Sequence, residues 1–105
     1  MTVQQADAQA IVDVTAELSE ARDHHGRFAS AHEGHSVIQE ELRELEAWVF
    51  TKRDHRDHYA MRQEAIQLAA MALKFAADSE RFVRQMPALP RADPTTDDVL
   101  EDVEP

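Results

Sequence analysis

The residues best placed to do chemistry are three glutamates on two neighbouring helical segments. Glu41 and Glu44 are three residues apart and therefore share one helix face. Glu64 belongs to the helical series 61, 64, 68, 71 and 75, in which the remaining four residues are all apolar. A carboxylate in an apolar stripe needs a proton, an ion pair or a metal ion to offset its burial. If the two helices pack antiparallel, we expect the three acids to converge on a divalent cation, Mg²⁺ above all. Such a cation can bridge to nucleotide phosphates and activate a water.

Three helices are expected to position these side chains. The first runs from about residue 4 to 23, with one apolar stripe: Ile11, Val14, Leu18 and Ala21. The second begins after the N-cap Ser30, with Glu33 placed as in a capping box. It ends near residue 51 and carries Ile38, Leu42, Leu45 and Val49. The charged stretch 51–58 is a loop, and the third helix spans about 57–84. Its stripe comprises Met61, Leu68, Met71, Phe75 and Phe82.

Composition limits the class of protein. The 105 residues suffice for one domain, here residues 1–86, followed by an acidic, Pro-containing tail at 87–105 that we expect to be disordered. A core this small favours completion by a second copy of the chain. The net charge of −10 argues against DNA or RNA binding, and the absence of Cys excludes thiolate sites. No signal peptide or membrane-spanning run is visible, so a cytoplasmic location without membrane contact is expected.

Two motifs resemble a known family. Residues 40–45 read EELREL and are similar to the EExxE motif of the MazG-like, all-α nucleoside triphosphate pyrophosphohydrolases. About twenty residues later, Glu64 to Gln67 (EAIQ) lie where that family carries ExxD. The resemblance covers about residues 8–84, and its flanking sequence is similar to small MazG-like proteins of phages and bacteria.

The resemblance implies an all-α bundle of three to four helices per chain, completed as a dimer or tetramer. It also implies Mg²⁺-dependent hydrolysis of a (deoxy)nucleoside triphosphate to the monophosphate and pyrophosphate. Carried over by position, Glu41, Glu44 and Glu64 are the metal ligands, and Gln67 replaces the fourth ligand, an Asp. Gln offers a carbonyl oxygen but no charge, and it cannot act as a base. The protein is then a slow enzyme, an enzyme that recruits Asp78 instead, or a protein that binds nucleotide without hydrolysing it.

Other side chains are candidates for substrate binding. Lys52 and Arg53 follow the second helix and can contact phosphates, although cations at a helix C-terminus are favoured in any case. Trp48 can stack on a base, with core or interface packing as its alternative role. Two pairs of histidines have the spacing of zinc ligands, but solvent-exposed helix ends explain them more simply: His32 with His35, and His55 with His58.

Three hypotheses follow. The first is the Mg²⁺-dependent pyrophosphohydrolase. The second is a catalytically silent nucleotide-binding or scaffold protein on the same bundle. The third is a helical oligomerisation module in which Glu64 pairs with a basic residue such as Arg62 or Lys74 across an interface.

Overall fold

A computed structural model describes the backbone of residues 1–85 and the side chains of residues 1–80. Three α-helices and one short 3₁₀ helix make up this part of the chain. In chain order they are α1 (Val3–His24), α2 (Ala31–Val49), η1 (Arg53–His55) and α3 (His58–Gln85). Residues 1–85 contain no strand, so the all-α prediction is confirmed for this part. The predicted tail at 87–105 and the side chain of Phe82 lie outside the described residues. No described helix is long and apolar enough to cross a membrane.

Local side-chain hydrogen bonds fix the helix starts. The Ser30 hydroxyl accepts from the backbone N–H of Glu33 at 3.1 Å, as the N-cap prediction requires. The Glu33 carboxylate accepts from the N–H of Ala29 at 2.9 Å rather than from that of Ser30, so the reciprocal half of the capping box is displaced by one residue. Asp57 caps α3 by accepting from the N–H of Ala60 at 3.0 Å.

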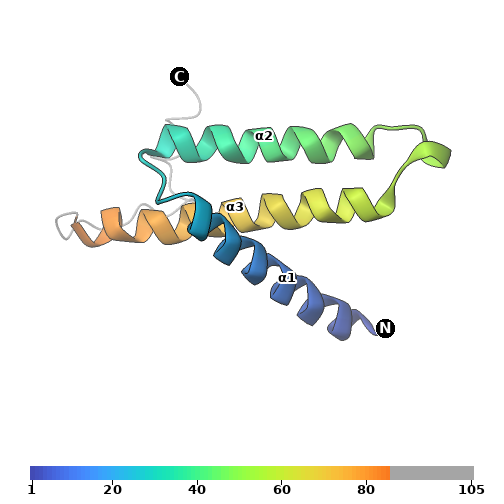
Figure 1. The fold of residues 1–105 in the computed structure, drawn as a ribbon, viewed down its shortest axis with the longest axis horizontal. Helices are drawn as coiled ribbons and strands as arrows, with labels where there is room; N and C mark the ends of the chain where they lie inside the picture. Colours follow the sequence, from blue (N-terminus) through green and yellow to red (C-terminus); the bar gives the residue numbers. More distant parts are fainter. Residues whose placement is uncertain (86–105) are drawn as a thin grey trace, which may run out of the picture.

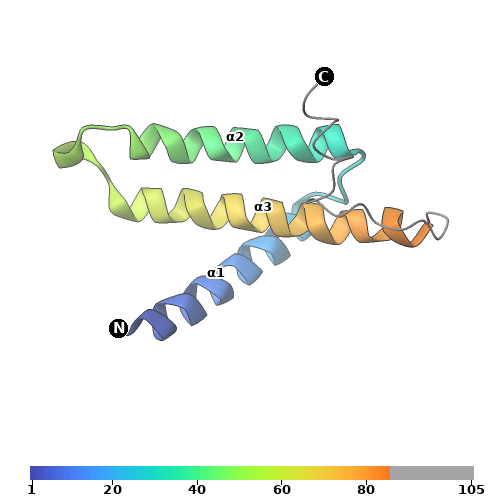
Figure 2. The same cartoon turned by 180° about the vertical axis from the view of Figure 1, so that it is seen from behind.

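The helices α2 and α3 lie side by side and antiparallel, joined by the connection that contains η1 (Figure 1). The helix α1 packs against α3 alone, and its N-terminal turns lead away from the pair (Figures 1 and 2). Two ion pairs fasten α1 to α3: Arg22 with Asp78 at 2.7 Å, and Asp13 with Arg62 at 2.8 Å. No residue of α1 is fully buried.

The apolar core is small and lies where the α1–α2 connection meets α3. Its buried members among the described residues are Phe28, Ile66 and Ala70. The Phe28 ring packs against Phe75 with centroids 6.3 Å apart, and Gly34 of α2 lies against both rings. Any side chain larger than hydrogen at position 34 would displace one of them.

The buried face of α3 differs from the predicted stripe. At a spacing of four, it consists of Ile66, Ala70, Lys74 and Asp78. The predicted members Met61, Leu68, Met71 and Phe75 flank this face and are half-buried. The prediction was wrong because the stripe was drawn through the large apolar residues, whereas Lys74 and Asp78 enter the interior as an ion pair with Nζ and Oδ2 3.7 Å apart.

Candidate metal centre

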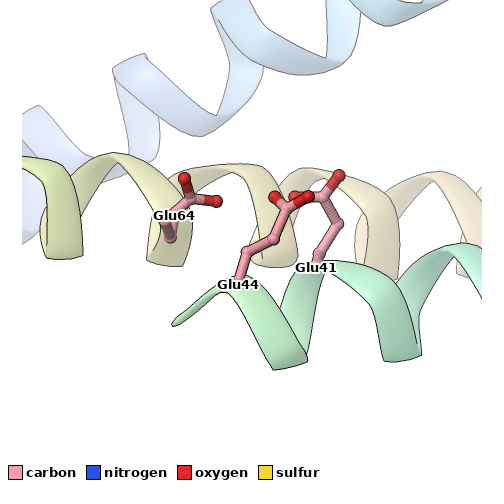
Figure 3. A group of neighbouring side chains, drawn as sticks. All are labelled: Glu41, Glu44 and Glu64. Carbon is pink, nitrogen blue, oxygen red and sulfur yellow. The ribbon is translucent and has the colours of Figure 1, made fainter. Parts of the chain in front are cut away.

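The three glutamates converge between α2 and α3. Glu41 and Glu44 occupy successive turns of α2, and Glu64 projects from the facing side of α3 (Figure 3). One carboxylate oxygen from each of the three lies within 4.8 Å of the others. Antiparallel packing therefore brings these residues together as the spacing suggested, and their role as metal ligands stays a prediction.

The acidic cluster has no cation to balance it among the ion pairs of residues 1–80. Arg62 is bound to Asp13, and Lys74 is bound to Asp78, so both cations named as alternative partners of Glu64 are engaged elsewhere in the same chain. Glu41 and Glu64 are half-buried, while Glu44 is exposed at the rim. Acids in this arrangement repel one another unless a proton or a cation intervenes.

Burial and mutual repulsion change the proton affinity of the cluster. Burial raises the pKa of Glu41 from 4.5 to about 7, and the neighbouring carboxyl of Glu44 adds to the effect through its charge and a hydrogen bond. The pKa of Glu64 is also raised, by burial and then by Glu44. Glu41 is therefore partly protonated near neutral pH, and a cation that binds here must displace that proton.

Gln67 lies between the acids, one turn after Glu64 on α3. With its NH₂ group oriented toward them, it donates to Oε2 of Glu41 at 3.1 Å and to Oε2 of Glu64 at 3.3 Å. This orientation is the one that satisfies the hydrogen-bond network. Rotation of the amide presents the carbonyl oxygen to the same point instead. Three carboxylates and one amide oxygen form a set of hard donors that suits Mg²⁺.

An open cavity of about 830 Å³ adjoins the cluster at Glu41 and Gln67. It is enclosed by the C-terminal half of α1, the α1–α2 connection, the N-terminal half of α2 and the middle of α3. Its lining includes Arg27, Phe28 and Lys74, which the sequence analysis did not assign to a site. The one signal for Lys74 was its i,i+4 spacing from Asp78 on a face shared with Ala70.

The predicted substrate contacts lie elsewhere. Trp48 is half-buried in the last turns of α2, and Lys52 and Arg53 are exposed in the connection to α3. None of the three lines the cavity, which extends from Glu41 toward the opposite end of α2. Within one chain, the structure therefore does not bring these residues together with the cavity beside the acids.

Two further candidates are not assembled into a site. The four paired histidines are exposed, and among residues 1–80 Glu41, Glu44 and Glu64 form the one group of three or more His, Asp or Glu side chains close enough to share an ion. Asp78 cannot replace the acid missing at position 67, because it lies about 16 Å further along α3. It is also buried and bound to Arg22 at 2.7 Å.

Comparison with known proteins adds no relative: no family model, curated protein or solved structure matches this chain. The resemblance of residues 40–45 and 64–67 to the MazG-like motifs therefore stays a prediction. The acidic cluster and the cavity beside it are the features of this structure that indicate a function.

Proposed function

We propose that the chain binds Mg²⁺ through Glu41, Glu44 and Glu64 and hydrolyses a (deoxy)nucleoside triphosphate to the monophosphate and pyrophosphate. The observation that carries this proposal is the convergence of three carboxylate oxygens from two helices within 4.8 Å. Two features support it: no described cation neutralises the cluster, and a cavity of about 830 Å³ opens directly beside it. That volume falls in the range typical of small-molecule sites.

Each side chain has a distinct part in such a reaction. When bound, Mg²⁺ supplies the positive charge that joins the carboxylates to phosphate oxygens and makes a water more acidic. Glu44, exposed at the rim, is accessible to the phosphate chain. Glu41, whose pKa in the ion-free chain is raised to about 7, gives up its proton when it ligates the cation. Glu64 and Gln67 fix the α3 side of the site.

A specific observation favours a second candidate, nucleotide binding without hydrolysis or a scaffold role. Gln67 stands where a fourth acid would add charge, and it stabilises the ion-free cluster by donating to Glu41 and Glu64. Both effects weaken cation binding relative to a site with Asp at this position. The hydrolase and the silent nucleotide-binding protein share the same binding geometry and differ in turnover, whereas a scaffold needs no nucleotide.

A second copy of the chain is part of the proposal. Large apolar side chains remain exposed on α1 and around the α2–α3 connection: Ile11 at 66%, Val12 at 59%, Phe50 at 79% and Tyr59 at 72%. Because α1 has no buried residue, its apolar side chains gain most from a partner surface. We propose a dimer or tetramer that covers the exposed apolar side chains of α1. Light scattering should then show an oligomer that Ile11→Glu dissociates.

The decisive test is pyrophosphate release from a panel of nucleoside triphosphates with Mg²⁺. Glu41→Gln and Glu64→Gln should each abolish the release of pyrophosphate. The control Glu46→Gln, which changes an exposed acid of α2, should leave the release unchanged. Gln67→Asp should increase it. Activity that survives Glu64→Gln would refute the assignment. Turnover only in Gln67→Asp, combined with nucleotide binding by the wild type, would select the silent alternative.

A further inference from the structure

One wall of the cavity beside the acidic cluster is held to α3 by a buried carboxylate, Asp78. Its Oδ1 binds the Arg22 guanidinium of α1 at 2.7 Å, and its Oδ2 accepts the backbone N–H of Phe28 at 2.8 Å. Asp78 is 5% exposed. One side chain of α3 thus holds both the C-terminal end of α1 and the α1–α2 connection. These two segments form one wall of the cavity.

Lys74 completes this arrangement. Its ammonium group lies 3.4 Å from the centroid of the Phe28 ring and 3.7 Å from the Asp78 carboxylate, and its side chain is buried. The position of Phe28, and with it the connection, is therefore fixed through both its backbone and its ring. The Lys74 ammonium is engaged by the Phe28 ring and by the Asp78 carboxylate, which it shares with Arg22.

The charges that line the cavity indicate what it accepts. Even without Glu41, which belongs to the cluster, acidic residues outnumber Lys and Arg there: Glu17, Glu20 and Glu33 against Arg27 and Lys74. Such a lining repels a polyphosphate chain. The lining also includes apolar groups from Ala21, Val37 and Met71, and such a mixture is expected around an uncharged, hydrogen-bonding ligand.

From these contacts we infer that Asp78 is a positioning residue that builds the cavity, and that the cavity takes the nucleoside part of the substrate. The inference rests on the proposed function, because it places the phosphates at the glutamate cluster. The nucleoside then enters along the face of α3 that carries Gln67, Met71 and Lys74, at spacings of four and three. Asp78 touches neither the substrate nor the ion, and it acts through Phe28 and Arg22.

Two variants test the inference from different directions. Asp78→Asn removes the charge that holds Arg22 and Lys74. Ala21→Leu fills the cavity without touching Asp78, and Ala16→Leu, at an exposed position of the same helix, is its matched control. The probes are Mn²⁺, a nucleoside monophosphate with Mg²⁺, and inorganic pyrophosphate with Mg²⁺, each titrated against the full chain.

Asp78→Asn and Ala21→Leu should each weaken nucleoside monophosphate binding, and raise KM where turnover is present, by about tenfold or more. Mn²⁺ affinity, pyrophosphate affinity and kcat should stay within about twofold of the wild type, and Ala16→Leu should match the wild type throughout. If Asp78→Asn fails to fold, Ala21→Leu alone decides the ligand and Asp78→Glu tests the positioning role. An equal loss of pyrophosphate affinity in Ala21→Leu would place the phosphates in the cavity and overturn the inference.

The same measurements distinguish failure of the proposed function from failure of the inference. A wild-type chain that binds Mn²⁺ and nucleoside monophosphate without turnover would refute the proposed hydrolysis and leave the assignment of the cavity to the nucleoside intact. Methyl resonances of Ala21 and Met71 should shift when nucleoside monophosphate is added. If these resonances do not move, the inference is overturned whatever the turnover.

Discussion

Mg²⁺ binding should depend strongly on pH in the range where ordinary glutamates do not titrate. The pKa of Glu41 is raised from 4.5 to about 7, first by burial and then by the nearby Glu44. Because a carboxylate must lose its proton before it can ligate a cation, the proton and the ion compete for the same oxygens. The raised pKa of Glu64 acts in the same direction.

The magnitude follows from Glu41 alone. With a pKa of about 7, roughly nine-tenths of its carboxyls are protonated at about pH 6 and roughly one-tenth at about pH 8. Mg²⁺ affinity should therefore rise about tenfold between these two conditions. A glutamate with its ordinary pKa would give almost no change over the same interval.

Isothermal titration calorimetry in buffers of different ionisation enthalpy measures both the affinity and the number of protons released. We expect close to one proton per ion at about pH 6 and close to none at about pH 8. Glu46→Gln is the control, because this exposed acid lies outside the cluster and its loss should leave the profile unchanged. A flat affinity without proton release would refute the reasoning about the cluster.

Three further predictions concern packing, the ion-free state and the fourth ligand. In urea denaturation, Gly34→Ala should lower the free energy of unfolding by about 1–3 kcal/mol, because the new Cβ overlaps the Phe75 ring. A Cβ at position 26 would have no atom within 4 Å, so the control Gly26→Ala should change the free energy of unfolding by less than about 1 kcal/mol. The raised folded-state pKa of Glu41 contributes stability that is complete below 4.5 and is lost as pH rises through about 7. The ion-free thermal midpoint should therefore fall over that range, and Glu41→Gln should flatten the slope. Gln67→Asp should strengthen Mg²⁺ binding by adding a charge, and an unchanged calorimetric affinity would place residue 67 outside the ion's ligands.

The sequence was sufficient to predict the helices and the meeting of the acids. The periodic apolar residues and the Ser30 cap located α2, and α1 and α3 begin within about two residues of their expected starts. Glu41, Glu44 and Glu64 followed from local spacing combined with one assumption, the antiparallel packing of two consecutive helices. A short connection between helices makes that assumption a natural one.

The cavity and its wall were not predictable in the same way. They depend on how α1 and the α1–α2 connection pack on α3, through ion pairs and a backbone hydrogen bond between residues about 50 apart in sequence. The stripe on α3 was drawn through the large apolar residues, so Lys74 and Asp78 were left out of the core. Asp78 was instead suggested as a replacement for the acid missing at position 67.

The two polar clusters along α3, one around Asp78 and one around Glu64, differ in how their charges are balanced. This difference indicates which cluster stabilises the fold and which one binds a ligand. At Asp78, the carboxylate pairs with Arg22 and Lys74. Burial raises the pKa of Asp78, but these two cations and the Phe28 N–H outweigh that effect and hold the pKa below its ordinary value of 3.8. That cluster is satisfied without a ligand and stabilises the packing of α1. At Glu41, burial and the neighbouring carboxyls of Glu44 and Glu64 raise the pKa of the side chain. The fold therefore retains an unfavourable arrangement of like charges, which a bound cation would stabilise. Gln67 reduces the repulsion between the acids by donating hydrogen bonds to Glu41 and Glu64. The same amide therefore stabilises the ion-free chain and weakens its affinity for the ion.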